Sequence, residues 1–443
     1  MHHYCMPYTR QKYILVGLVD GPTGCDREIR DSADDADDTG GSMTSRRPAS
    51  TIPGWYWLAY LTGGFGLAFN VMMTFLLPLR ASDLGIGIGV IGLLLGVKGA
   101  VEAVVSVQVG GVVDRIGPRR AFIIGTAGCT LLVALYALAT TLLALVLLQL
   151  AVGVLRPMAW VGSQSFVAGL REGADQARDT GRLSLFATGS QVVGPLLVGF
   201  AAQIGDTGSA FYALAAYCAT FTVIGLLVPK GSDAGSRQAT KRRGLVSGLR
   251  LLSIRGIRVV MLLTFARLWI TTAFGAFFPL LLVTGGTSEG SAATVVASTA
   301  IVATMLSPTT GRLAERLRVD TLAALALSFG ALGLVVAPLF DSFPAAYVVA
   351  FLVGIGNGIS LPTLLVLVSR AVSPDKRGLA LGLRAGFNQL AAALAPILVA
   401  AVSAATAATT GFVLAGGVAA GLIGTAAVTS RRGPQEESRQ QPE

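Results

Sequence analysis

Long apolar segments recur along this chain from Trp55 onward, and short polar breaks separate them. Each segment has about 20 residues or more, which is the length a helix needs to cross the roughly 30 Å hydrocarbon core of a bilayer. A helix satisfies its own backbone hydrogen bonds, so such segments can span lipid without water. We therefore predict an all-α polytopic membrane protein with twelve spanning helices, over residues 55–80, 86–113, 120–139, 142–168, 182–204, 209–229, 257–284, 290–311, 321–340, 343–369, 378–402 and 408–429.

The composition excludes most classes of soluble protein. Charged residues make up 13% of the chain and hydrophobic residues 53%, whereas soluble domains carry about 25% charge. The chain shows no nucleotide-binding loop and no nucleophile–base arrangement, so we expect neither enzyme activity nor a cofactor. We also expect no metal site, because the histidines and cysteines lack the spacing of metal ligands: they are His2, His3, Cys5, Cys25, Cys129 and Cys218.

The basic residues predict how the helices are oriented. The net charge is +10, but the arginines and lysines form no aromatic-interleaved patch, so we expect no nucleic-acid partner. They concentrate in the breaks after the even-numbered helices, whereas the other breaks contain only Arg80. Short loops rich in arginine and lysine stay in the cytoplasm. Both termini are therefore predicted to be cytoplasmic, with lipid around the helices.

Composition shifts divide the chain into five parts. Residues 1–54 contain an acidic run and form a predicted disordered tail, within which Met43 offers an alternative start codon. Residues 55–229 and 257–429 each hold six predicted helices. Residues 230–256 form a basic linker, which is either solvated or carries an interfacial helix with Leu245, Leu249 and Leu252 on one face. Residues 430–443 form a polar cytoplasmic tail.

An offset of 201 residues relates the two sets of six helices. It places Pro78 on Pro279 and Pro195 on Pro396, and the pair Asp114-Arg115 on the acid–arginine pair 315–316. Prolines and charged pairs are too rare in this composition for chance to align them repeatedly. The sequence therefore predicts two pseudo-symmetric six-helix bundles, the architecture of many transporters.

The break between the second and third helices carries a recognisable motif. Gly110, Asp114, Arg115, Gly117 and Arg119 stand in the spacing Gly-x-x-x-Asp-Arg-x-Gly-x-Arg. This segment resembles the signature of the major facilitator superfamily, Gly-x-x-x-Asp-Arg-x-Gly-Arg-Arg, from which the proline at position 118 departs.

The resemblance covers residues 55–430 and implies a role for the motif. In this family the motif latches the two bundles together while the transporter faces outward. The second half carries a reduced copy that includes Glu315 and Arg316. The alternative is a solvated turn that only sets topology.

The fifth predicted helix contains Gly189, Gly194, Pro195 and Gly199. This set resembles the Gly-Pro motif of the superfamily's proton-coupled drug exporters, although the outer glycines are one place off its spacing. The alternative is ordinary packing and kinking, since glycine and proline are common in membrane helices.

Ionisable residues inside predicted spans are candidate functional residues, because each costs roughly 2.5–3.5 kcal/mol to insert. Lys98 and Glu102 lie one turn apart on the second helix, and Glu102 is the only carboxylate well inside a predicted bundle. A buried carboxylate can exchange protons, so Glu102, with Lys98 beside it, is the predicted coupling site. The alternative is a permanent Lys98–Glu102 ion pair that joins helices.

The resemblance also implies that the first, fourth, seventh and tenth helices line a central substrate cavity. Their polar members are Asn70, Gln149, Arg156, Arg267, Thr271 and Asn357. The predicted function is secondary active transport by a monomer in the bacterial inner membrane, exporting a small organic compound by proton antiport. Two alternatives remain open. One is a carrier for an anionic metabolite, because Lys98, Arg156, Arg267 and Arg384 face a single carboxylate; the other is a receptor or scaffold on the same fold.

Overall fold

A computed structural model describes residues 53–171, 174–229, 250–373 and 376–431. Met43, Leu245, Leu249 and both predicted tails beyond these bounds lie outside the described residues. Leu252 lies in a 3₁₀ turn, Arg250–Ser253, that leads into the second half of the chain.

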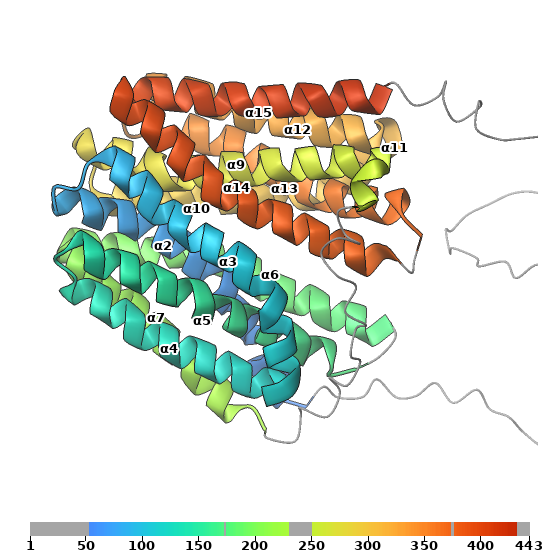
Figure 1. The fold of residues 1–443 in the computed structure, drawn as a ribbon, viewed down its shortest axis with the longest axis horizontal. Coiled ribbons are helices and arrows are strands. Elements are labelled where there is room, and N and C mark those ends of the chain that lie inside the picture. Colours follow the sequence, from blue (N-terminus) through green and yellow to red (C-terminus); the bar gives the residue numbers. More distant parts are fainter. Residues whose placement is uncertain (1–52, 172–173, 230–249, 374–375, 432–443) are drawn as a thin grey trace, which may run out of the picture. The chain divides into compact units, whose positions relative to one another are not determined.

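The described residues form helices and no strands (Figure 1). The first half contains α1 (Trp55–Leu61), α2 (Gly63–Asp83), α3 (Ile88–Ile116), α4 (Pro118–Leu138), α5 (Leu142–Ala168), α6 (Ala174–Ile204) and α7 (Thr207–Leu227). The second contains α9 (Arg255–Thr284), α10 (Glu289–Leu306), α11 (Thr310–Arg316), α12 (Val319–Val336), α13 (Tyr347–Ala371), α14 (Arg377–Ala405) and α15 (Ala408–Arg431), with short 3₁₀ turns at Ser307–Thr309 and Ala337–Leu339.

Twelve helical segments in the described part of the chain are long and apolar enough to cross a bilayer. Helices α1 and α2 together make the first of them, and α10 continues through α11 to make the eighth. The predicted all-α fold with twelve spanning helices is confirmed.

The two halves repeat the same local geometry at the predicted offset. Gly85 follows α2 with φ of 74°, and Gly286, which lies 201 residues later, follows α9 with φ of 92°. Glycine is the residue that adopts positive φ without steric cost. The preceding hydrogen bonds repeat as well, from the Leu84 amide to the Arg80 carbonyl at 3.1 Å and from the Gly285 amide to the Leu281 carbonyl at 3.0 Å.

Helix packing repeats at the same offset. A Cβ atom at Gly153 of α5 would lie 2.9 Å from the Val101 side chain and 3.4 Å from the Lys98 carbonyl of α3. A Cβ atom at Gly354 of α13 would lie 2.7 Å from Val302 and 3.1 Å from the carbonyl at position 299 of α10. Both glycines permit close helix approach at equivalent positions, which confirms two pseudo-symmetric six-helix bundles.

The bundles meet along α3 with α14, α6 with α10, and α2 with α9. We call the end of the molecule that carries Arg115, Arg119, Arg316 and Arg370, near α11 in Figure 1, the basic end, and the other the opposite end. Glycine residues make close contacts between bundles toward the opposite end. A Cβ atom at Gly99 would lie 2.8 Å from the backbone nitrogen of Ala393 in α14.

The helices part toward the basic end. A Cβ atom at Gly110, Gly189, Gly382 or Gly386 would meet no described atom within 4 Å. Gly189 of α6 and the two glycines of α14 are exposed. The structure is therefore packed between bundles at the opposite end and open at the basic end.

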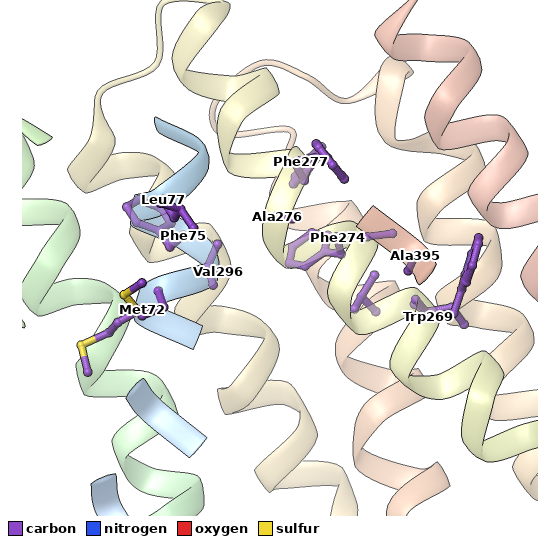
Figure 2. Close-up of a cluster of buried hydrophobic side chains, with 14 of the residues drawn as sticks. Met72, Phe75, Leu77, Trp269, Phe274, Ala276, Phe277, Val296 and Ala395 are labelled. Carbon is purple, nitrogen blue, oxygen red and sulfur yellow. The ribbon is translucent and has the colours of Figure 1, made fainter. Parts of the chain in front are cut away.

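Apolar side chains from both bundles share one buried cluster (Figure 2). Figure 2 shows Met72, Phe75 and Leu77 of α2 on the side of the cluster near Val296 of α10, while Phe274 and Trp269 extend it along α9. Each of these side chains is at most 4% exposed. Large apolar side chains thus fill this contact between the bundles, next to the contact of α3 with α14 that glycines line.

Candidate functional site

A carboxylate lies buried near the middle of α3. Glu102 is 3% exposed, and both its oxygens accept hydrogen bonds from Arg156 of α5, at 2.6 Å from Nε and 2.6 Å from Nη2. This bidentate arrangement is the strongest form of arginine–carboxylate contact. Arg156 also donates to the Gly66 carbonyl of α2 at 3.3 Å, so it ties three helices of the first bundle together.

Lys98 contributes a second positive charge to this group. Its Nζ lies 3.7 Å from Glu102 Oε1 and donates to the side-chain oxygen of Asn70 on α2. The predicted Lys98–Glu102 pair therefore exists, but Arg156 is the closer partner of the carboxylate. We call Asn70, Lys98, Glu102 and Arg156 the charged cluster.

Gln389 connects the charged cluster to the second bundle. Its Nε2 atom, on α14, donates to Glu102 Oε2. The carboxylate therefore takes donors from both bundles, and its surroundings must change if the bundles separate here.

Gln149 does not face the space between the bundles. It is 1% exposed, its oxygen accepts from the Tyr136 hydroxyl at 2.9 Å, and its amide nitrogen donates to the Leu94 carbonyl at 3.2 Å. The expectation that Gln149 lines the cavity is corrected, because its polar groups are satisfied inside the first bundle. The other five predicted cavity residues lie in the charged cluster or on α9 and α13.

The second bundle presents a polar face of different character. Thr271 of α9 donates to the side-chain oxygen of Asn357 of α13 at 2.8 Å, and Arg267 lies one turn before Thr271. Arg384 and Asn388 lie one turn apart on α14, which packs against α9. Nε of both arginines and Oδ1 of Asn388 are buried without a hydrogen-bond partner.

The predicted latch residues of the two bundles form no ion pairs with each other in the part of the chain that the structure describes. Asp114, Arg115, Glu315 and Arg316 are exposed, and none of them forms an ion pair with a described residue. Gly117, with φ of 91°, makes the turn from α3 to α4. Their latch role stays a prediction, which requires the basic end to close.

Arg119, the remaining arginine of the motif, holds the end of α7. Its Nε donates to the Val228 carbonyl at 2.8 Å and its Nη2 to the Leu226 carbonyl at 2.9 Å. Cations are favourable at helix C-termini because the last carbonyls there lack helical donors. The contact fixes the loop that carries the motif against the first bundle.

The Gly-Pro set of α6 faces both bundles. A Cβ atom at Gly194 would lie 3.1 Å from Met72 of α2, and one at Gly199 would lie 2.9 Å from the Glu289 carbonyl of α10. Pro195 lies inside the helix, whereas Gly189 is exposed at the open end. Two of the three glycines therefore serve close packing here.

One buried polar group was missed from the sequence. Asp179 of α6 is 0% exposed and accepts hydrogen bonds from the Tyr60 hydroxyl at 2.7 Å and from Arg171 Nε at 2.8 Å. Hydrogen bonding to Asp179 raises the pKa of the Arg171 guanidinium above its usual range. The signal was present, because Arg171, Asp175 and Asp179 follow one another at four-residue spacing, which on a helix forms one face.

The comparisons with known proteins agree with this geometry. A family model of the Major Facilitator Superfamily matches residues 56–396, and a second match covers residues 260–443. The chain belongs to this superfamily. It is therefore a multi-pass membrane transporter that moves a small molecule.

Two curated superfamily relatives are bacterial. Multidrug resistance protein MdtG of Dickeya zeae (strain Ech586) is 25% identical over 353 residues, which cover 76% of this chain and 85% of the relative. The protein of the same name from Klebsiella pneumoniae (strain 342) is 24% identical over 364 residues, covering 79% and 86%.

Solved structures of transporters share the superfamily fold. The nucleoside transporter NupG superposes with a TM-score of 0.70 at 16% identity, covering 86% of this chain and 100% of that one. A bacterial homolog of the human lysosomal transporter Spinster, in an inward-facing and occupied conformation, gives a TM-score of 0.70 at 14% identity, covering 88% and 98%.

Proposed function

We propose that this transporter exports a small organic compound across the bacterial inner membrane in exchange for protons. The observation that carries the proposal is the buried carboxylate of Glu102, which contacts both bundles. In alternating access the two bundles rock about a central site, which opens to one side of the membrane at a time. A carboxylate at their contact is exposed to different surroundings in the two states, which is what proton coupling requires.

The arrangement of the bundles supports this cycle. The basic end is open and the opposite end is packed, and loop arginines mark the cytoplasmic side of a bacterial membrane protein. The structure then represents the inward-facing state, ready to take up a compound from the cytoplasm. The names of the MdtG relatives, which are multidrug resistance proteins, favour export as the direction.

Two steps would move the proton. Separation of α14 from α3 removes the Gln389 donor from Glu102 and opens a path for a proton from the opposite end. Rearrangement of Arg156 then leaves the carboxylate with fewer opposing charges, and an undercompensated buried carboxylate favours the protonated form. Return to the packed state restores the donors and releases the proton at the basic end.

The test is transport in everted membrane vesicles with and without a proton gradient, between pH 5.5 and 8.5. Glu102→Gln keeps the size of the side chain and removes its charge. We expect it to abolish gradient-driven transport while downhill exchange persists. Asp341→Asn, which alters an exposed loop carboxylate, is the matched control and should retain coupling. Gradient-driven transport by Glu102→Gln would refute Glu102 as the coupling residue, and ligand binding without flux in the wild type would refute transport itself.

A further inference from the structure

Two arginines on the polar face of the second bundle have no counter-charge. Arg267 of α9 and Arg384 of α14 form no ion pair and no side-chain hydrogen bond with any described residue, and Nε of each is buried without a partner. The helices that carry them, α9 and α14, pack against each other. We call this pair, with Asn388, the arginine site.

In the first bundle, by contrast, the buried positive charges have partners that compensate them. There Arg156 and Lys98 share the carboxylate of Glu102, and Lys98 also donates to the side-chain oxygen of Asn70. Of the four cations predicted inside the spans, Arg156 is therefore neutralised by Glu102, and Lys98 is neutralised in part. The two at the arginine site stay uncompensated.

An uncompensated pair of this kind is unfavourable by itself. Each arginine costs roughly 2.5–3.5 kcal/mol inside a membrane domain, and charged residues there are almost always paired or line a water-filled path. Two adjacent positive charges add repulsion to this cost. The arrangement becomes favourable when an anion lies between the guanidinium groups.

The arginine site lies where a compound from the open end would arrive. Gly382 and Gly386 lie at the level of Arg384 along α14, on the face that meets α3, and both are exposed, whereas close packing of α14 on α3 begins farther along, at Ala393. Two-residue spacing places Arg384 on a different face of the helix, and both arginines are half-buried. Arg267 lies twelve residues into α9, which is about 18 Å along a helix with a 1.5 Å rise per residue. Arg384 lies seven residues into α14, which is about 10 Å by the same rise. The site is therefore on the parted stretch, in the half of the bundle toward the basic end.

We infer that the transported compound carries an acidic group, a carboxylate or a phosphate, which Arg267 and Arg384 bind together. The inference rests on the proposed function and gives it a substrate class. Guanidinium groups suit this task, because their planar donors match the oxygens of carboxylates and phosphates. Asn388 adds an acceptor without a donor, so a hydroxyl or amino group beside the acid completes the match.

The test compares matched acids and amides on the purified full chain. Salicylate and salicylamide share their shape and hydroxyl and differ in charge, while sulfate and inorganic phosphate are oxyanions without an organic part. A ligand that binds the folded state raises its melting temperature. We expect stabilisation by salicylate or the oxyanions and none by salicylamide.

Two variants and a control locate the binding. Arg267→Gln and Arg384→Gln should each weaken acid binding by about tenfold or more, the loss expected for one charged hydrogen bond. Arg370→Gln, an exposed arginine at the basic end, is the control and should bind as the wild type does. Without ligand, each of the first two variants should melt at or above the wild-type temperature, because it removes an uncompensated charge. If an arginine had a structural role alone, replacing it would instead lower the melting temperature.

The outcomes separate this inference from the proposed function. Equal effects of acids and amides, no stabilisation by any of the four probes, or unchanged acid binding in both variants would overturn the arginine site. Proton-driven export of an uncharged compound that survives Arg267→Gln would also overturn it while leaving the proposed function standing. Acid binding that depends on both arginines, without proton-driven flux, would support the site and reject the proposed function.

Discussion

Gly92→Ala should shift the balance between the two access states. Gly92 lies on α3 where that helix crosses α14, and an added Cβ would fall inside van der Waals contact with the Ala400 side chain and the Pro396 carbonyl. Neither atom is the end of a flexible side chain, so the helices themselves would have to move apart. In a state that opens the opposite end, the same methyl group would face free space.

The expected size follows from the contact. Forcing an extra methyl group into a close-packed site costs about 1–3 kcal/mol, and that cost applies to the packed state alone. The ratio of the two states should then change by about 5- to 150-fold in favour of the opposite-end-open state. Gly417→Ala on α15 makes the same substitution where no described atom lies within 4 Å of the new methyl group, so it should leave the ratio unchanged.

Spin labels would report the change. Cysteines placed at Gly87 and Thr406, the residues that cap α3 and α14 at the opposite end, would carry them in a chain freed of its native cysteines. We expect a second, longer distance to appear in Gly92→Ala. An unchanged distance distribution, or the same change in Gly417→Ala, would refute the argument that this glycine contact holds the opposite end closed.

Three further predictions concern the latch, the charged cluster and the topology. Asp114→Asn should lower flux several-fold without lowering the amount of protein in the membrane, as quantified by immunoblot beside the transport assay; unchanged flux would leave the motif a topological role alone. Arg156→Ala should destabilise the protein by about 3–5 kcal/mol, because it leaves Glu102 buried without its main partner, and adding Glu102→Gln should recover part of the loss in a thermal melt; a larger loss in the double variant would contradict this. Reporter fusions at Lys230 and Ser430 should both be active in the cytoplasm, and an external location of either would reject the predicted topology, in which an even number of helices precedes each site.

The sequence predicts the helices well because lipid leaves few alternatives. An apolar segment of membrane-spanning length has to be a helix, and the twelve predicted segments overlap the twelve that the described residues form. Helix ends are less predictable, because hydropathy falls at the membrane surface while the backbone hydrogen bonds continue. Helix α6 begins at Ala174, eight residues before the predicted start, and the added turns contain Asp179.

Partners in the site were harder to predict than its members. Four-residue spacing identifies neighbours on one helix, so Lys98 was the visible partner of Glu102. Arg156 is 54 residues away in the chain, and Gln389 is 287 residues away, so their contacts depend on how helices rotate and cross. The same uncertainty placed Gln149 on the wrong face of α5.

The uncompensated charges of Arg267 and Arg384 have an electrical consequence. An energised bacterial membrane is negative inside, and its voltage falls mainly across the part of a transporter that is closed. In the proposed orientation the basic end faces the cytoplasm, so the two arginines sit near the inner potential when that end is open and near the outer potential when the opposite end is open. Each positive charge then favours the first state by up to about 2.3 kcal/mol per 100 mV. The membrane voltage would therefore hold the empty carrier in the inward-facing state. A bound dianion would cancel that bias, so substrate binding would allow the change to the outward-facing state.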